Sequence, residues 1–114
     1  MAKLTKKENI EINRLRGLFP GVISVNVERS QDGGFFAEVK NFPGCFTEAN
    51  TFSELIEMVN DAVKTYFDVP DKYLSFMPNY MPPLKQAQRL DAFPVVEKAS
   101  ELKLEIFHRE KVAR

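Results

Sequence analysis

The sequence predicts an α+β domain in which three short antiparallel strands precede a helix that covers one face of their sheet. Three observations lead to this class: strict alternation of apolar and polar residues from Val22, two glycine-containing turns between short extended runs, and an apolar stripe at helical spacing from Leu55 to Tyr66. The length of 114 residues and the hydrophobic content of 44% suit one core. We therefore expect residues 1–114 to form a single domain.

The first elements expected are a short helix and a β-hairpin. Residues 5–18 carry apolar side chains among charged ones, and a glycine and a proline close this helical run. Residues 22–28 then alternate as a half-buried strand does. Residues 30–34 have the composition of a tight turn, and residues 35–39 resume the extended pattern. The buried face of the first strand should carry Ile23, Val25 and Val27.

A third strand and a longer helix follow the hairpin. Residues 45–48 form the strand, after a second turn. Thr51 and Glu54 have the spacing of a capping box, in which each side chain bonds a backbone amide at the start of a helix. Pro70 stops this helix. Its core-facing stripe is expected to consist of Leu55, Val59, Ala62, Val63 and Tyr66.

The segment 70–100 is rich in proline and aromatic residues and divides the predicted core, 22–70 and 101–108, into two parts. Disordered linkers are poor in aromatic residues, so we expect this extension to be packed. A small monomer seldom exposes many large apolar groups in one patch, which predicts a homodimer or a larger assembly. The expected oligomer contacts are Tyr73, Phe76, Tyr80 and Met81. Residues 102–106 alternate again and predict a last strand.

Residues 34–55 contain a glycine-aromatic turn, an alanine-containing strand, the sequence Pro-Gly-Cys, and a threonine followed three residues later by glutamate at the start of a helix. Their order and spacing resemble the signature of HicB-family antitoxins, and the resemblance covers residues 22–70. The sequence departs from that signature at Lys40, Ala49 and Leu55, where the family often has proline, glycine and alanine. The positions that carry the motif are Gly34, Ala37, Pro43, Gly44, Cys45, Thr51 and Glu54.

The resemblance implies a partial ribonuclease H-like fold, with a fourth strand parallel to the first and beside it. It also implies a non-catalytic protein without a cofactor, which covers the active surface of a small basic HicA toxin that cuts messenger RNA. Many family members carry a C-terminal helix-turn-helix or ribbon-helix-helix module that binds DNA. Residues 84–114 show neither module, so the chain resembles a solitary member and is not expected to bind nucleic acid directly.

Charge favours a basic protein partner. The net charge is zero, but residues 21–71 hold nine acidic and three basic side chains. An acidic region repels a phosphate backbone and attracts a cationic surface. The outward side of the predicted helix carries a stripe at steps of three and four residues, which consists of Glu54, Glu57, Asp61, Lys64 and Asp68. Its four acidic members are expected to bind the partner. The alternative is that this stripe is an ordinary solvated helix face.

Cys45 and His108 invite the idea of a nucleophile and its base, which we reject. Activation of a thiol needs a base or a positive field beside it, and nothing in the sequence brings His108 there. Cys45 is better explained as a small buried hydrophobe, and His108 as a surface residue. One cysteine and one histidine do not make a zinc site. A single cysteine and the lack of any apolar run of about 18 residues together favour a cytoplasmic protein.

Two further functional classes stay open. The fold implied by the resemblance also occurs in nucleases that hold two metal ions between carboxylates. The candidate metal ligands in this sequence are Glu28, Glu54 and Glu105. Such carboxylates have to converge on ions about 4 Å apart, and Glu28 lies at the end of its strand. The other class is a self-associating regulatory domain that has no toxin partner.

Overall fold

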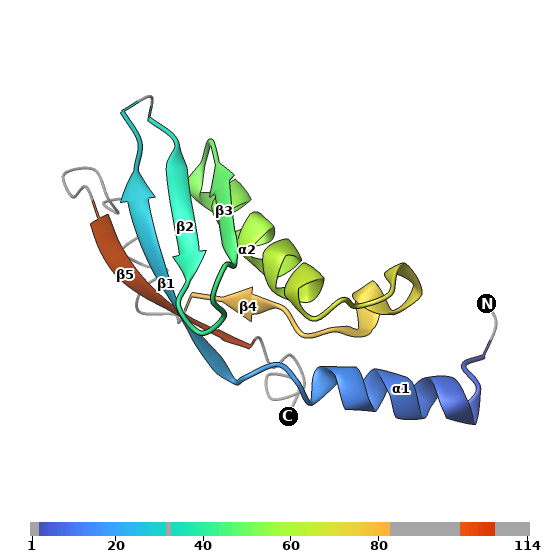
Figure 1. Cartoon of the computed structure of the whole chain (residues 1–114). Helices are drawn as coiled ribbons and strands as arrows, with labels where there is room; N and C mark the ends of the chain where they lie inside the picture. Colours follow the sequence, from blue (N-terminus) through green and yellow to red (C-terminus); the bar gives the residue numbers. More distant parts are fainter. Residues whose placement is uncertain (1–2, 32, 83–98, 107–114) are drawn as a thin grey trace, which may run out of the picture.

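A computed structural model describes residues 3–31, 33–82 and 99–106 of the chain (Figure 1). An N-terminal helix leads into the sheet, a second helix follows the first three strands, and a short 3₁₀ helix leads to the last two. In chain order the elements are α1 Lys6–Arg16, β1 Val22–Arg29, β2 Phe35–Val39, β3 Phe46–Ala49, α2 Phe52–Tyr66, η1 Asp71–Phe76, β4 Tyr80–Met81 and β5 Ala99–Ile106. The predicted α+β class is confirmed.

The strands form one five-stranded sheet in the order β3-β2-β1-β5-β4, and every neighbouring pair is antiparallel. The expected meander of β1, β2 and β3 is present, and a later strand lies beside β1. Its expected parallel direction is wrong: Val22 faces Glu105 and Glu28 faces Ala99, so β5 runs antiparallel to β1. The direction of β5 is a property of its long-range pairing with β1 and β4, which the alternation within a strand does not encode. Because β4 pairs antiparallel with β5, the strand parallel to β1 is β4, one place further out.

Helix α2 covers one face of the sheet, and the core lies between them (Figure 1). Ile23, Val25 and Val27 are buried, as the alternation of β1 predicts. Leu55, Val59 and Val63 meet them from α2. The expected stripe is wrong at its last position: Tyr66 is 45% exposed, because its ring stacks on Phe42 at the margin of the core, with centroids 4.8 Å apart.

The proline- and aromatic-rich segment folds onto this same core as far as Met81. Tyr73 and Tyr80 are buried within the chain, and the Tyr80 hydroxyl donates a hydrogen bond to the Pro20 carbonyl oxygen. These two tyrosines were expected to pack across a subunit boundary, and their burial corrects that expectation. Phe76 and Met81 are exposed. Assembly into a homodimer or a larger oligomer stays a prediction, and Phe76 and Met81 are the expected contacts that remain available for it.

Within the described ranges, no helix is long and apolar enough to cross a membrane.

Helix α1 begins with a capping box, in which Thr5 Oγ1 accepts from Glu8 N–H at 3.0 Å and Glu8 Oε1 accepts from Thr5 N–H at 2.9 Å. Its buried side chains are Ile12 and Leu15. This helix adjoins the start of β1 and lies away from β3 (Figure 1), and none of its residues lines the surface described next.

Candidate partner-binding groove

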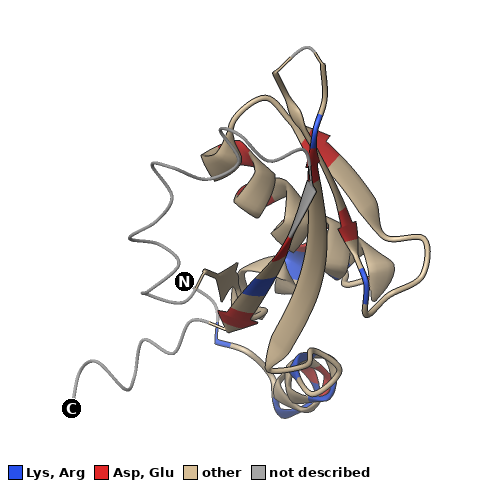
Figure 2. Ribbon diagram, turned by 90° about the vertical axis from the view of Figure 1, so that its left-hand side faces the viewer, with Lys and Arg blue, Asp and Glu red and all other residues tan. Residues whose placement is uncertain are grey.

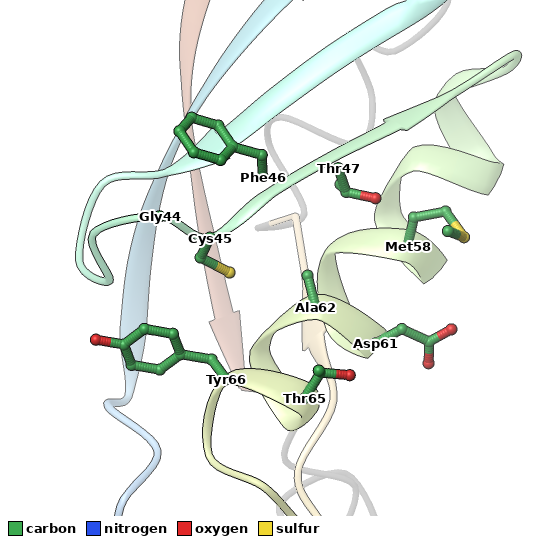
Figure 3. Close-up of a pocket in the computed structure, with 9 residues that line it drawn as sticks. All are labelled: Gly44, Cys45, Phe46, Thr47, Met58, Asp61, Ala62, Thr65 and Tyr66. Carbon is green, nitrogen blue, oxygen red and sulfur yellow. The ribbon is translucent and has the colours of Figure 1, made fainter.

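A hollow of about 350 Å³ lies between strand β3 and helix α2 (Figure 3). Cys45 and Thr47 point into the space from the β3 side, whereas the Phe46 ring points away from α2. Met58 and Tyr66 stand at its two ends on the helix. The complete lining is Gly44, Cys45, Phe46, Thr47, Met58, Asp61, Ala62, Thr65 and Tyr66.

A second hollow of about 360 Å³ continues past the other end of β3. It shares Met58 with the first hollow, and both have residues of β3 in their walls. Its residues come from the β1–β2 turn, the start of β2, the end of β3 and the first half of α2, and they are Ser30, Gly34, Phe35, Phe36, Glu48, Ala49, Asn50, Glu54 and Met58. We call the two hollows together the β3–α2 groove.

Two turns with glycine fix the position of β3. Gly44 has φ +82°, a conformation that side chains with a Cβ resist, and the Cys45 N–H donates to the Phe42 carbonyl at 3.0 Å within the same turn. At the other end, a Cβ added to Gly34 would lie 3.1 Å from the carbonyl oxygen of Ala49. The motif glycines therefore shape the strand that forms one wall of the groove.

A side-chain cap fixes the start of α2, the other wall. Thr51 Oγ1 accepts from Glu54 N–H at 3.1 Å, as the spacing predicts. The Glu54 carboxylate accepts instead from Asn50 N–H, one residue before Thr51, at 2.7 Å. Both side chains therefore satisfy backbone amides, and a Glu54 oxygen is anchored at the rim of the second hollow.

The acidic side chains expected to bind a partner are in part brought together at this groove. Glu54 lines the second hollow, Asp61 lines the first, and Glu57 is exposed on α2 between them along the chain. Within the described residues, neither Glu57 nor Asp61 has a hydrogen-bond or ion-pair partner. Lys64 does not neutralise Asp61, because its Nζ donates to Asn79 Oδ1 at 3.0 Å.

Asp68 does not belong to this acidic face, which corrects its place in the expected stripe. Helix α2 ends at Tyr66, and Asp68 adopts φ +54° beyond it. Its N–H donates to Thr65 O at 3.0 Å, and Val69 N–H donates to Lys64 O at 3.2 Å. This pair of bonds is a Schellman motif, which turns the chain away from the helix axis. Asp68 therefore serves the helix end.

The remaining chemical candidates do not form a catalytic centre in the described part of the chain. Cys45 is buried, as expected, and burial raises the pKa of its thiol, which disfavours the reactive thiolate. Glu28 pairs with Ala99 and Glu105 with Val22, so these two carboxylates lie six residues apart along neighbouring strands, about 20 Å. They cannot share a metal pair. His108 lies outside the described residues.

No group of three or more histidine, cysteine, aspartate or glutamate side chains among the described residues is arranged to hold a metal ion. Figure 2 shows acidic residues on the strands and on α2, whereas basic residues lie on α1 together with acidic ones, at a few sites on the sheet, and at Lys64 of α2. The groove therefore offers negative charge beside apolar side chains. This combination suits a polypeptide ligand with cationic and apolar groups.

Sequence patterns missed the apolar part of this surface. Met58 is 37% exposed and is common to both hollows. Phe36 stacks on Phe46 on the face of the sheet opposite α2, with centroids 5.7 Å apart. Phe46 is 51% exposed. Aromatic residues at outward positions of two alternating strands were the signal that could have revealed this patch.

Comparison with known proteins gives two relatives, both named UPF0150 protein. One is a UPF0150 protein of Archaeoglobus fulgidus, 35% identical over 46 residues, which are 40% of this chain and 67% of the relative. The chain belongs to the UPF0150 family. A UPF0150 protein of Thermotoga maritima is 40% identical over 47 residues, 41% of this chain and 64% of that relative. No protein-family model and no solved structure matches the chain. The names of these UPF0150 relatives state no activity.

Proposed function

We propose that this UPF0150 protein is a non-catalytic, antitoxin-like binding protein of the cytoplasm. Its partner is a basic ribonuclease toxin of the HicA type, and binding neutralises the toxin by covering its active surface. The motif at residues 34–55 supports this proposal through its resemblance to HicB antitoxins. The relatives support only the family.

The observation that carries the proposal is the pair of carboxylates, Glu57 and Asp61, which have no ion-pair partner among the described residues and lie beside a groove that also contains the exposed side chain of Met58. They are like charges four residues apart on one helix, an arrangement that destabilises a helix by a few tenths of a kcal/mol. A cationic surface on the partner relieves this repulsion, and electrostatic attraction between the two surfaces raises the association rate.

The test is an RNA cleavage assay with three samples. We expect a small basic ribonuclease toxin encoded beside this chain to cut messenger RNA alone, and to stop cutting when the purified chain is added at equal stoichiometry. The chain alone should leave RNA intact in the presence of Mg²⁺. Cleavage by the chain alone would contradict a non-catalytic role, and undiminished cleavage in the mixture would contradict neutralisation.

A second candidate function is a self-associating regulatory domain without a toxin, and the exposed Phe36–Phe46 pair favours it. Light scattering at micromolar concentration tests this candidate, for which we expect the mass of a dimer or a larger assembly. The mass of a monomer would contradict self-association.

A further inference from the structure

Strand β3 is an edge strand with main-chain groups that point away from the sheet. Within the described ranges it pairs with β2 alone. At the end of β2, Val39 N–H donates to Cys45 O, just before β3, at 2.9 Å, and the next residue, Lys40, donates its N–H to Ser24 O of β1 at 2.8 Å. Successive residues here therefore bond alternately to the β3 side and to the β1 side. The same alternation along β3 directs the N–H and C=O groups of Phe46 and Glu48 outward. An incoming strand can bond to them.

The side chains beside this edge have a matching order. Glu54, Met58 and Asp61 lie on one stripe of α2, at steps of four and three residues, and all three line the β3–α2 groove. Glu54 and Asp61 are about 10 Å apart along the helix axis. Every second side chain of an extended segment points the same way, and positions i and i+4 are about 13 Å apart. Two long cationic side chains at i and i+4 therefore reach both acids, with position i+2 opposite Met58.

Charge decides between a foreign strand and a second copy of this chain. Pairing of β3 with β3 of a second copy would place the Glu48 side chains and the Asp61-bearing helix faces of both copies along one new strand pair. Within the described residues no cation neutralises either acid. Like charges in such a contact oppose association, whereas a basic segment is attracted.

We propose that β3 receives an extended segment of the basic partner as an added strand, and that the groove selects a pattern of cationic, any, apolar, any and cationic residues. This inference rests on the proposed function and specifies how the partner binds. Main-chain bonds to Phe46 and Glu48 supply the docking, while Glu54, Met58 and Asp61 supply the selection.

The experiment uses the full-length chain and labelled nine-residue peptides with Lys-Thr-Ile-Thr-Lys at their centre, measured by fluorescence anisotropy. Two further peptides carry N-methyl groups on alternate residues, one on each edge of the extended segment. We expect one methylated peptide to lose affinity about tenfold or more, because its blocked amides face β3, and the other to bind like the parent. Equal affinities, or no binding of the parent, would overturn the proposal.

Variants separate the two parts of the inference. Asp61→Asn should weaken the parent peptide about threefold at low salt, and Asp68→Asn should leave affinity unchanged because Asp68 caps the helix end. A peptide with glutamate in place of both lysines should not bind; if it binds as well as the parent, charge selection is wrong. The parent peptide is also titrated at higher protein concentrations. If the chain then assembles and no longer binds the peptide, the β3 edge is the contact with a second copy instead.

The peptide experiment and the toxin assay can fail independently of each other. Neutralisation of the toxin together with equal binding of both methylated peptides would reject strand addition and leave the antitoxin role standing. A clear difference between the methylated peptides without any neutralisation would keep strand addition and reject the toxin as partner.

Discussion

The Asn60 carboxamide holds both main-chain polar groups of Tyr80. Asn60 Oδ1 accepts from Tyr80 N–H at 2.6 Å, and Asn60 Nδ2 donates to Tyr80 O at 3.0 Å and also to Ile56 O at 2.9 Å. Asn60 is the buried polar residue of the described core. Its amide imitates a strand neighbour for β4, so helix α2 and the outer strand of the sheet are fixed to each other.

Replacement of this amide should destabilise the fold strongly. In Asn60→Ala the main-chain groups of Tyr80 lose their partner in a buried place, which we expect to cost about 2–4 kcal/mol. Urea unfolding measures the effect. Asn79→Ala is the control, because Asn79 is exposed and should change stability by less than about 0.5 kcal/mol. Equal stability of Asn60→Ala and wild type would show that the Tyr80 bonds contribute nothing.

The Tyr80 hydroxyl gives the protein a specific sensitivity to alkali. Burial raises the pKa of Tyr80 to about 12 from the ordinary value of 10.0. The folded chain thus holds this proton more tightly than the unfolded chain, so its contribution to stability is present below pH 10 and is lost as pH rises towards 12. Thermal melting across this range should show a steeper loss for wild type than for Tyr80→Phe. Identical slopes would contradict the assignment.

The turn before β3 should require glycine. Gly44→Val forces a β-branched residue into φ +82°, and we expect a loss of about 1–3 kcal/mol. Gly21→Val is the matched control, because Gly21 has no positive φ and an added Cβ there meets no atom within 4 Å. Thermal melting compares the two variants. An unchanged midpoint for Gly44→Val would show that this turn does not need glycine.

The end of α2 should be improved by glycine. Asp68 occupies the left-handed position of the Schellman motif, and its negative charge lies at the negative end of the helix dipole. We expect Asp68→Gly to stabilise the chain by about 0.5–1 kcal/mol in urea unfolding. Asp68→Asn removes only the charge and should give a smaller gain. A loss of stability in Asp68→Gly would reveal a contact of the carboxylate that outweighs the backbone.

Local patterns predicted most of the elements, because period-two alternation and the capping spacing depend on neighbouring residues. They missed β4, since a two-residue strand held by Asn60, twenty residues earlier, leaves no periodic signal. The direction of β5 was expected from the family resemblance and was wrong; it depends on long-range pairing with β1 and β4, which local alternation does not encode. Tyr73 and Tyr80 looked like an exposed patch for a similar reason: their partners are distant in sequence.

The sequence predicted the charged residues of the candidate site but not the groove beside them. Helical spacing placed Glu57 and Asp61 correctly on the outward side of α2. It also placed Asp68 there, because sequence spacing does not reveal that the helix ends at Tyr66. The groove itself arises from the distance between α2 and the edge strand, which depends on the packing of the whole core.

The most direct test of the account is the association rate of the chain with a basic ribonuclease toxin at two salt concentrations. Glu57→Lys with Asp61→Lys should fold normally, since both side chains are exposed, and should associate about tenfold more slowly at low salt. The control, Glu105→Lys with Asp71→Lys, makes the same change in net charge at exposed positions outside the lining of the groove and should retain most of the rate. Added salt should slow wild type and narrow the difference, because screening limits exposed charges to about 8 Å near physiological ionic strength. If the variant with Glu57→Lys and Asp61→Lys associates with the toxin and inhibits it as wild type does, the acidic face of α2 does not bind the toxin.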